Sequence, residues 1–134
     1  MIKLSNRSYK KELLDQDNIP FADIQQNMKE LNTINKWLGG HKITIEGLRS
    51  LISKHSGIKP ICICEIGCGG GDNLKAISNY CTAKDIPVHF IGIDIKQECI
   101  DFAKQQYPDL HSTWITSDYQ LADLEEYKPD IIFS

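Results

Sequence analysis

The fold of this chain is decided by one stretch, Ile61-Cys62-Ile63-Cys64-Glu65-Ile66-Gly67-Cys68-Gly69-Gly70-Gly71-Asp72. Five of its first six residues are apolar or carry sulfur, and the β-branched Ile recurs, which is typical of a strand buried on both faces of a parallel sheet. Four glycines then occupy the five positions 67–71, and apolar side chains return at helical spacing in residues 73–80. The stretch therefore predicts a strand, a tight glycine turn and a helix.

The glycine turn is a candidate ligand site. Glycine lets the backbone bend sharply or approach a ligand closely, and the first N–H groups of the following helix are free to face that ligand. The dinucleotide fingerprint Gly-x-Gly-x-x-Gly fits at Gly67 and Gly69 but fails at its sixth position, which is Asp72. Glu65 and Asp72 would repel a pyrophosphate and suit a ligand with an ammonium or sulfonium group. A compact connection without a ligand is the other interpretation.

The spacing does match an acid followed by glycine at every second position, at Glu65, Gly67, Gly69 and Gly71. At these residues the chain resembles the class I (seven-strand, Rossmann-like) S-adenosylmethionine-dependent methyltransferases, whose first motif is acid-x-Gly-x-Gly-x-Gly. The resemblance implies S-adenosyl-L-methionine as cofactor, S-adenosyl-L-homocysteine as its product, and a doubly wound parallel α/β sheet. It covers residues 61–134 well and residues 20–57 loosely.

Composition restricts the class of protein. The 134 residues suit one domain, and 41% hydrophobic with 25% charged residues is ordinary globular material. The net charge is −3 and no basic block occurs, so nucleic acid is not expected as a partner. No apolar run approaches the roughly 18 residues of a membrane span, and residues 1–7 lack the apolar core of a secretory signal. We expect a cytoplasmic protein with no membrane partner.

The five cysteines, at positions 62, 64, 68, 81 and 99, raise the question of a metal site. The chain has no Cys-x-x-Cys pair and no histidine near the first three cysteines, and Cys62 and Cys64 share one face of the predicted strand. Small buried thiols in a reducing compartment explain the pattern. We predict no metal.

Residues 1–57 are predicted to form an N-terminal helical cap, and residues 58–134 the first half of a cofactor-binding Rossmann-like domain. A short helix is expected around residues 9–14. A long helix beginning near Asp23 carries an apolar stripe and ends at Gly39-Gly40; the stripe consists of Ile24, Met28, Leu31, Ile34, Trp37 and Leu38. A second helix is expected to start after Thr44 as its N-cap and to end before Gly57.

Two helices around a Gly-Gly turn could also indicate a DNA-binding helix-turn-helix. Only five basic and two acidic residues occur between positions 24 and 56, which is ordinary for a solvated face. We favour a cap packed on the sheet, because similar methyltransferases of small molecules carry such a cap, which often covers the cofactor and helps to shape the acceptor pocket. Gly39-Gly40-His41 is the segment of interest there, although a lone histidine is also common as a surface or packed residue.

A second buried strand is predicted over residues 88–95, with Asp94 at its carboxyl end. Strand, helix and strand in about thirty residues form a parallel right-handed crossover, and ligands of such sheets bind beyond the carboxyl ends of the strands. Asp94 is therefore expected beside the glycine turn, where its two oxygens could accept both hydroxyls of a ribose. It could instead cap the helix that follows at residues 97–103.

A third strand is predicted at residues 111–116, followed by Ser117 and Asp118. The resemblance implies that Asp118 takes the amino group of adenine. Alternatively, Ser117 and Asp118 cap a helix over residues 120–127. Residues 131–134 then read as the start of a fourth strand.

The family sheet has seven strands in the order 3-2-1-4-5-7-6, and this chain supplies the first four. An apolar edge formed by residues 131–133 would then be exposed. We expect the chain to be a fragment of a longer protein, and pairing of this edge in a homo-oligomer is the alternative.

The resemblance implies methyl transfer from S-adenosylmethionine to a small-molecule acceptor, with oxygen as the preferred acceptor atom. It implies that Glu65 contacts the ammonium group and that backbone of the glycine turn lines the methionyl and ribose groups. It further implies that Asp94 binds the ribose, and that Ile95 and Asp118 contact the adenine, with Ser134 near the methyl donor. The cofactor-binding candidates are Glu65, Gly67, Cys68, Gly69, Gly71, Asp94, Ile95, Ser117, Asp118 and Ser134. No catalytic base can be assigned. A non-catalytic cofactor-binding module and a nicotinamide-dependent oxidoreductase are the alternatives.

Overall fold

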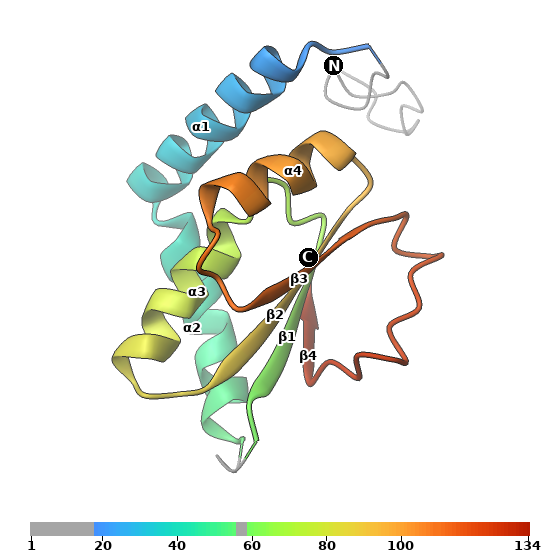
Figure 1. Cartoon of the computed structure of the whole chain (residues 1–134). Coiled ribbons are helices and arrows are strands. Elements are labelled where there is room, and N and C mark those ends of the chain that lie inside the picture. The colour runs from blue at the N-terminus through green and yellow to red at the C-terminus, as the bar shows by residue number, and fades with distance from the viewer. Residues whose placement is uncertain (1–17, 56–58) are drawn as a thin grey trace, which may run out of the picture.

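The computed structural model describes residues 18–55 and 59–134, and its centre is a parallel sheet of four strands (Figure 1). The strand order is β3-β2-β1-β4, with every neighbouring pair parallel. The strands are β1 (Ile61–Ile66), β2 (Val88–Asp94), β3 (Ser112–Thr116) and β4 (Ile131–Phe133). The predicted order 3-2-1-4 and the Rossmann-like α/β class are confirmed.

Strand β1 lies inside the sheet and organises both cores. Ile61 and Ile63 are buried on one face, and Cys64 is buried on the other. A buried strand needs apolar side chains on both faces, which is why β1 reads as an almost continuous apolar run. Glu65 is the exception, and the register places it beside Gly92 of β2 and Phe133 of β4.

Helices cover the face of the sheet that carries Ile61 and Ile63 (Figure 1). The helices of the described residues are α1 (Phe21–Leu38), α2 (Gly40–Ser53), α3 (Asp72–Ala83) and α4 (Gln97–Gln106). Helix α3 connects β1 to β2, and α4 connects β2 to β3. Both connections move in the same direction across the sheet. Right-handed crossovers place such helices on the same face. Leu48 and Ile52 of α2 pack into this core as well.

The opposite face is covered by the connection between β3 and β4. Ala122, Leu124 and Tyr127 of this connection pack against Cys64 and Ile91. The return from β3 to β4 crosses the sheet in the other direction, so a right-handed connection must run over this second face.

The helix predicted over residues 120–127 is wrong, because this connection consists of turns. Asp118 Oδ1 accepts the N–H of Gln120, and Asp123 Oδ1 accepts the N–H of Glu125. Such local bonds from aspartate side chains offer the backbone an alternative to the helical ladder. Ala122, Leu124 and Tyr127 still pack against the sheet, whereas Leu121 is 82% exposed.

Helix α1 packs on two other helices. It contacts α2 and α4, and Ile24 is its only buried residue. The end of its apolar stripe is open to solvent, with Trp37 85% and Leu38 77% exposed. None of the helices within residues 18–55 and 59–134 combines the length and hydropathy that a membrane span requires.

The junction of α1 and α2 is tighter than predicted. Gly39 ends α1 with a left-handed φ of 72°, and α2 begins at the next residue. Thr44 is therefore inside α2 and is not its N-cap; its hydroxyl donates to the Gly40 carbonyl at 3.2 Å. A single left-handed residue reverses the chain here, so no separate cap is needed. The helix expected near residues 9–14 and the stop at Gly57 lie outside the described residues.

Candidate functional site

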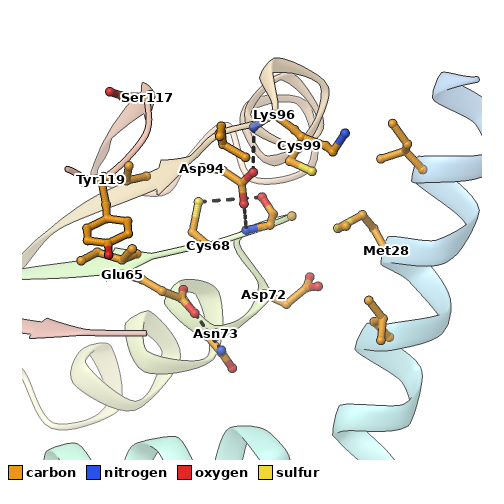
Figure 2. Close-up of a pocket in the computed structure, with 18 of the residues that line it drawn as sticks. Met28, Glu65, Cys68, Asp72, Asn73, Asp94, Lys96, Cys99, Ser117 and Tyr119 are labelled. Atoms are coloured by element: carbon orange, nitrogen blue, oxygen red, sulfur yellow. Dashed lines mark hydrogen bonds between the residues drawn. The ribbon is translucent and has the colours of Figure 1, made fainter. Parts of the chain in front are cut away.

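A pocket of about 560 Å³ opens at the carboxyl ends of β1, β2 and β3 (Figure 2). The glycine turn after β1 and the segment after β2 form one wall. Helix α1 forms the facing wall with apolar side chains, including that of Met28. This is the edge of a parallel sheet at which ligands bind.

The glycine turn is fixed to the neighbouring strand. The N–H groups of Gly67 and Cys68 both donate to the Ile93 carbonyl, at 2.8 and 2.9 Å. A Cβ added at Gly71, where φ is +80°, would lie 2.6 Å from the ring of Trp114, whereas a Cβ at Gly67 would meet nothing within 4 Å. Gly71 is therefore required by packing inside the fold, while the space beside Gly67 is open.

Asp94 joins this turn to the connection after β2. Its Oδ2 accepts the N–H of Gly69 and its Oδ1 accepts the N–H of Lys96, both at 2.9 Å. Lys96 itself is the N-cap residue of α4, without a side-chain cap, so Asp94 shapes the turn that precedes the helix. Each carboxylate oxygen can accept a further hydrogen bond, so these contacts leave Asp94 able to bind a ligand hydroxyl.

Glu65 is a buried carboxyl group on the wall of the pocket, and only 4% of its surface is exposed. Its Oε1 accepts a hydrogen bond from Asn73 Nδ2 at 2.9 Å, whereas its Oε2 is buried without a partner (Figure 2). Burial raises the pKa of Glu65 from 4.5 to about 7; the Asn73 bond opposes this rise, and the carboxylates of Asp72 and Asp94 add to it. The site thus holds an acceptor oxygen that the protein itself leaves unsatisfied.

Acidic groups dominate the ionisable side chains of the described pocket wall. Glu65, Asp72, Asp94 and Asp118 contribute carboxyl groups, and Lys96 contributes an ammonium group. These carboxylates would repel the negative charges of a diphosphate bound in the pocket, so such a ligand is disfavoured. A ligand that carries a positive charge is favoured.

Two thiols also line the pocket, those of Cys68 and Cys99. Burial raises the pKa of Cys99 to about 12, and burial likewise raises the pKa of Cys68. Only a thiolate is an effective nucleophile or metal ligand, so both thiols are inert at neutral pH. Within residues 18–55 and 59–134, no group of three or more His, Cys, Asp or Glu side chains is arranged to hold a metal ion.

The structure brings most of the cofactor-binding candidates together. Those that line the pocket are Glu65, Gly67, Cys68, Gly69, Asp94, Ile95, Ser117 and Asp118. Gly71 and Ser134 are not among the lining residues. Gly71 lies under the Trp114 ring, and Ser134 follows β4 with an exposed side chain.

The residues of the apolar pocket wall are not among the cofactor-binding candidates named from the sequence. Ile24, Met28 and Leu31 of α1 line it, and Met28 Sδ would lie 3.4 Å from a Cβ at Gly69. These residues belong to the apolar stripe of the long N-terminal helix, in the segment that was expected to cover the cofactor and to shape the acceptor pocket. Periodicity identifies the apolar face of a helix, but it does not say whether a core or a pocket lies opposite.

The fold resembles solved structures of methyltransferases. The plantazolicin methyltransferase BpumL, solved with a monoazolic desmethylPZN analog and SAH, is 21% identical, with a TM-score of 0.50 over 75% of this chain and 45% of its own. A SAM-dependent methyltransferase of Leishmania major is 19% identical, with a TM-score of 0.53 over 84% and 46%. A protein of Methanococcus maripaludis assigned to the S-adenosyl-L-methionine-dependent methyltransferases is 19% identical, with a TM-score of 0.58 over 87% and 51%.

At these identities the likeness concerns the fold, and the chain spans about half the length of the solved structures that it resembles. No curated protein matches the sequence significantly. The sequence model of one family, described as "Methyltransferase domain", matches residues 63–134, which is more than half of the chain. This protein therefore belongs to the methyltransferase domain family.

Proposed function

We propose that this chain forms the cofactor-binding part of an S-adenosylmethionine-dependent methyltransferase that acts on a small-molecule acceptor, at an oxygen atom. The observation that carries the proposal is Glu65 Oε2, a buried acceptor without a partner on the wall of the pocket. A buried polar atom of this kind costs free energy unless a ligand satisfies it. The ammonium group of the methionine moiety supplies both an N–H donor and a positive charge.

The remaining wall fits an adenosine. Asp94 keeps acceptor capacity for the ribose hydroxyls while it holds the backbone of Gly69 and Lys96. Ile95 is 64% exposed and provides an apolar surface for the adenine ring. Asp118 lines the same pocket and has an acceptor for the adenine amino group.

When bound, the cofactor would supply an electrophilic methyl group, attached to its sulfonium. The protein's part is to hold that group in line with the acceptor, because fixed orientation accounts for much of the rate of such a transfer. The apolar residues Ile24, Met28 and Leu31 exclude water from one side of the pocket. The described residues are assigned to cofactor binding, and none is assigned to removal of a proton from the acceptor.

A small-molecule acceptor is supported by the apolar wall on α1 and by the neighbour solved with a desmethyl analog of plantazolicin and SAH. Oxygen is proposed as the acceptor atom from the resemblance to small-molecule enzymes with an N-terminal helical segment. The acidic wall argues against a nicotinamide dinucleotide, whose diphosphate would face several carboxyl groups.

The proposal is tested by calorimetric titration of the chain with S-adenosylhomocysteine, with NADH as the control ligand. We expect S-adenosylhomocysteine to bind and NADH not to bind. The variant Asp94→Ala should bind the first ligand at least about tenfold more weakly, because a hydrogen bond to a charged group contributes about 1.5–3 kcal/mol. Binding of NADH in place of S-adenosylhomocysteine by the folded chain contradicts the proposal.

A further inference from the structure

A chain of side-chain hydrogen bonds runs from the paired helices α1 and α2 into the pocket. His41 Nδ1 lies 2.7 Å from Asn73 Oδ1. The other end of the same amide, Asn73 Nδ2, donates to Glu65 Oε1 at 2.9 Å. Asn73 therefore stands between a histidine of α2 and the buried carboxyl group of β1, and both of its polar ends are engaged.

The His41 ring is itself held from two sides. It lies in the first turn of α2, directly after the tight Gly39-Gly40 junction. Its Nε2 lies 3.1 Å from Asn32 Oδ1 on α1. The ring thus connects α1, α2 and α3, and its orientation depends on the packing of all three helices.

The contact with His41 supports the orientation in which the NH2 end of the Asn73 amide faces Glu65. A side-chain amide has nearly the same shape after a half-turn, but then it presents its oxygen where its NH2 group stood. Asn73 Oδ1 can only accept, so His41 Nδ1 carries the proton in this contact. In the neutral ring Nε2 is then an acceptor, and it is satisfied when the Asn32 amide presents its NH2 group to it. With Oδ1 fixed by His41, the NH2 group is directed at Glu65 Oε1.

We propose that His41 is a positioning residue of the cofactor site: it fixes Asn73, which holds one oxygen of Glu65 and leaves Oε2 for a cationic nitrogen of the ligand. This assignment rests on the proposed function and deepens it. It connects the N-terminal helices to the amino-acid end of the cofactor and not to its adenosine end. Without His41, Asn73 Oδ1 loses its partner, and the amide is held less firmly in the orientation that donates to Glu65 Oε1.

Two ligands separate this role from a general defect of the fold. S-adenosylhomocysteine has an amino-acid moiety and an adenosine, whereas 5′-methylthioadenosine has the adenosine and a thioether without the amino-acid moiety. We expect His41→Leu to weaken binding of S-adenosylhomocysteine about tenfold, the effect of about one hydrogen bond. Binding of 5′-methylthioadenosine should change less than about twofold. Both affinities are measured by calorimetry on the full 134-residue chain.

Three further variants complete the experiment. His41→Asn places an NH2 group where Nδ1 stood and should restore most of the affinity for S-adenosylhomocysteine. In a double-mutant cycle, His41→Leu should add little to Asn73→Ala, because both act through one contact. His55→Leu is the matched control, since the ring of His55 contacts the Lys59 carbonyl and does not line the pocket; both affinities should stay unchanged.

The outcomes distinguish this assignment from the function on which it rests. If His41→Leu weakens both ligands equally, or weakens neither while the unaltered chain binds S-adenosylhomocysteine, the positioning role is wrong and the proposed function stands. If the unaltered, folded chain binds neither ligand, the proposed function is overturned, and this assignment with it.

Discussion

The pH dependence of ligand binding is the sharpest test of the role given to Glu65. Its pKa of about 7 in the folded chain means that the carboxyl group is partly protonated near neutrality. An ammonium group binds the ionised form, so binding releases the proton that Glu65 carries. Affinity for S-adenosylhomocysteine should therefore rise with pH through neutrality.

The size of the effect follows from the ionised fraction. A group with a pKa near 7 is about 9% ionised at pH 6 and about 76% ionised at pH 7.5. The affinity should thus increase about eightfold between these two pH values, and binding at pH 6 should release about 0.9 proton. Calorimetry in two buffers with different ionisation enthalpies measures both quantities in the same titrations.

Two controls identify Glu65 as the source of the dependence. Glu65→Gln should bind S-adenosylhomocysteine weakly and with a flat pH profile. 5′-Methylthioadenosine, which has no ammonium group, should bind the unaltered chain with nearly the same affinity at both pH values. An equal affinity of S-adenosylhomocysteine at pH 6 and 7.5, or an eightfold change that persists in Glu65→Gln, refutes the reasoning.

The raised pKa of Glu65 also affects the stability of the fold, which should fall with pH where the affinity for the ligand rises. The pKa of Glu65 is higher in the folded chain than its ordinary value of 4.5, so the folded state holds the proton more tightly. Stability without ligand should fall as pH rises from 4.5 towards 7, by up to about 3 kcal/mol. Glu65→Gln should remove this slope in urea denaturation, and an unchanged slope in the variant would assign it to other groups.

Three shorter predictions concern the turn, the far end of the sheet and the ribose contact. Gly71→Ala should destabilise the fold by about 2–5 kcal/mol in urea denaturation, because the new Cβ overpacks against Trp114 and the φ of +80° disfavours alanine. Gly67→Ala should cost only about 1–2 kcal/mol, because its Cβ meets open space, and equal losses for the two variants would contradict this. Burial, and then the ring of His111, hold the pKa of His89 below 6.5, so stability should fall as pH drops below that value and His89→Gln should reduce the loss, measured by thermal unfolding at pH 7.5 and 5.5. Asp94→Ala should weaken S-adenosylhomocysteine and 5′-methylthioadenosine alike in calorimetry, because both contain the ribose; a loss confined to one would argue against the ribose contact.

The sheet could be predicted from the sequence because its signals are local. Buried parallel strands read as apolar runs, the glycine turn marks the end of β1, and handedness determines the faces on which the crossovers lie. The same reasoning placed Asp94 beside the turn, where its Oδ2 bonds the N–H of Gly69. The sequence left open whether Asp94 binds a ligand or caps the following helix. That its two oxygens accept the N–H groups of Gly69 and Lys96 depends on the exact path of the turn.

The features that the sequence did not predict have one physical cause: the pattern of a segment does not specify which part of the fold it will contact. The stripe of α1 indicates an apolar face, but Met28 lines a pocket and Trp37 is left exposed. Ser117 and Asp118 have the residue types of a helix N-cap, but Asp118 and Asp123 accept hydrogen bonds from the backbone two residues on, and the segment consists of turns. His41 was singled out by its place after two glycines, and only tertiary packing shows that it reaches Asn73.

Glu65 is difficult to explain by the needs of the fold. It interrupts a buried apolar strand, receives one hydrogen bond from Asn73, and stands near the carboxylates of Asp72 and Asp94. An unsatisfied buried oxygen costs about 1–3 kcal/mol, and an apolar side chain in its place would avoid that cost. A ligand that brings a positive charge to Oε2 removes the same penalty, so binding and stability are coupled at this residue. The carboxyl group that costs the fold stability is therefore the one that favours binding of a cationic ligand.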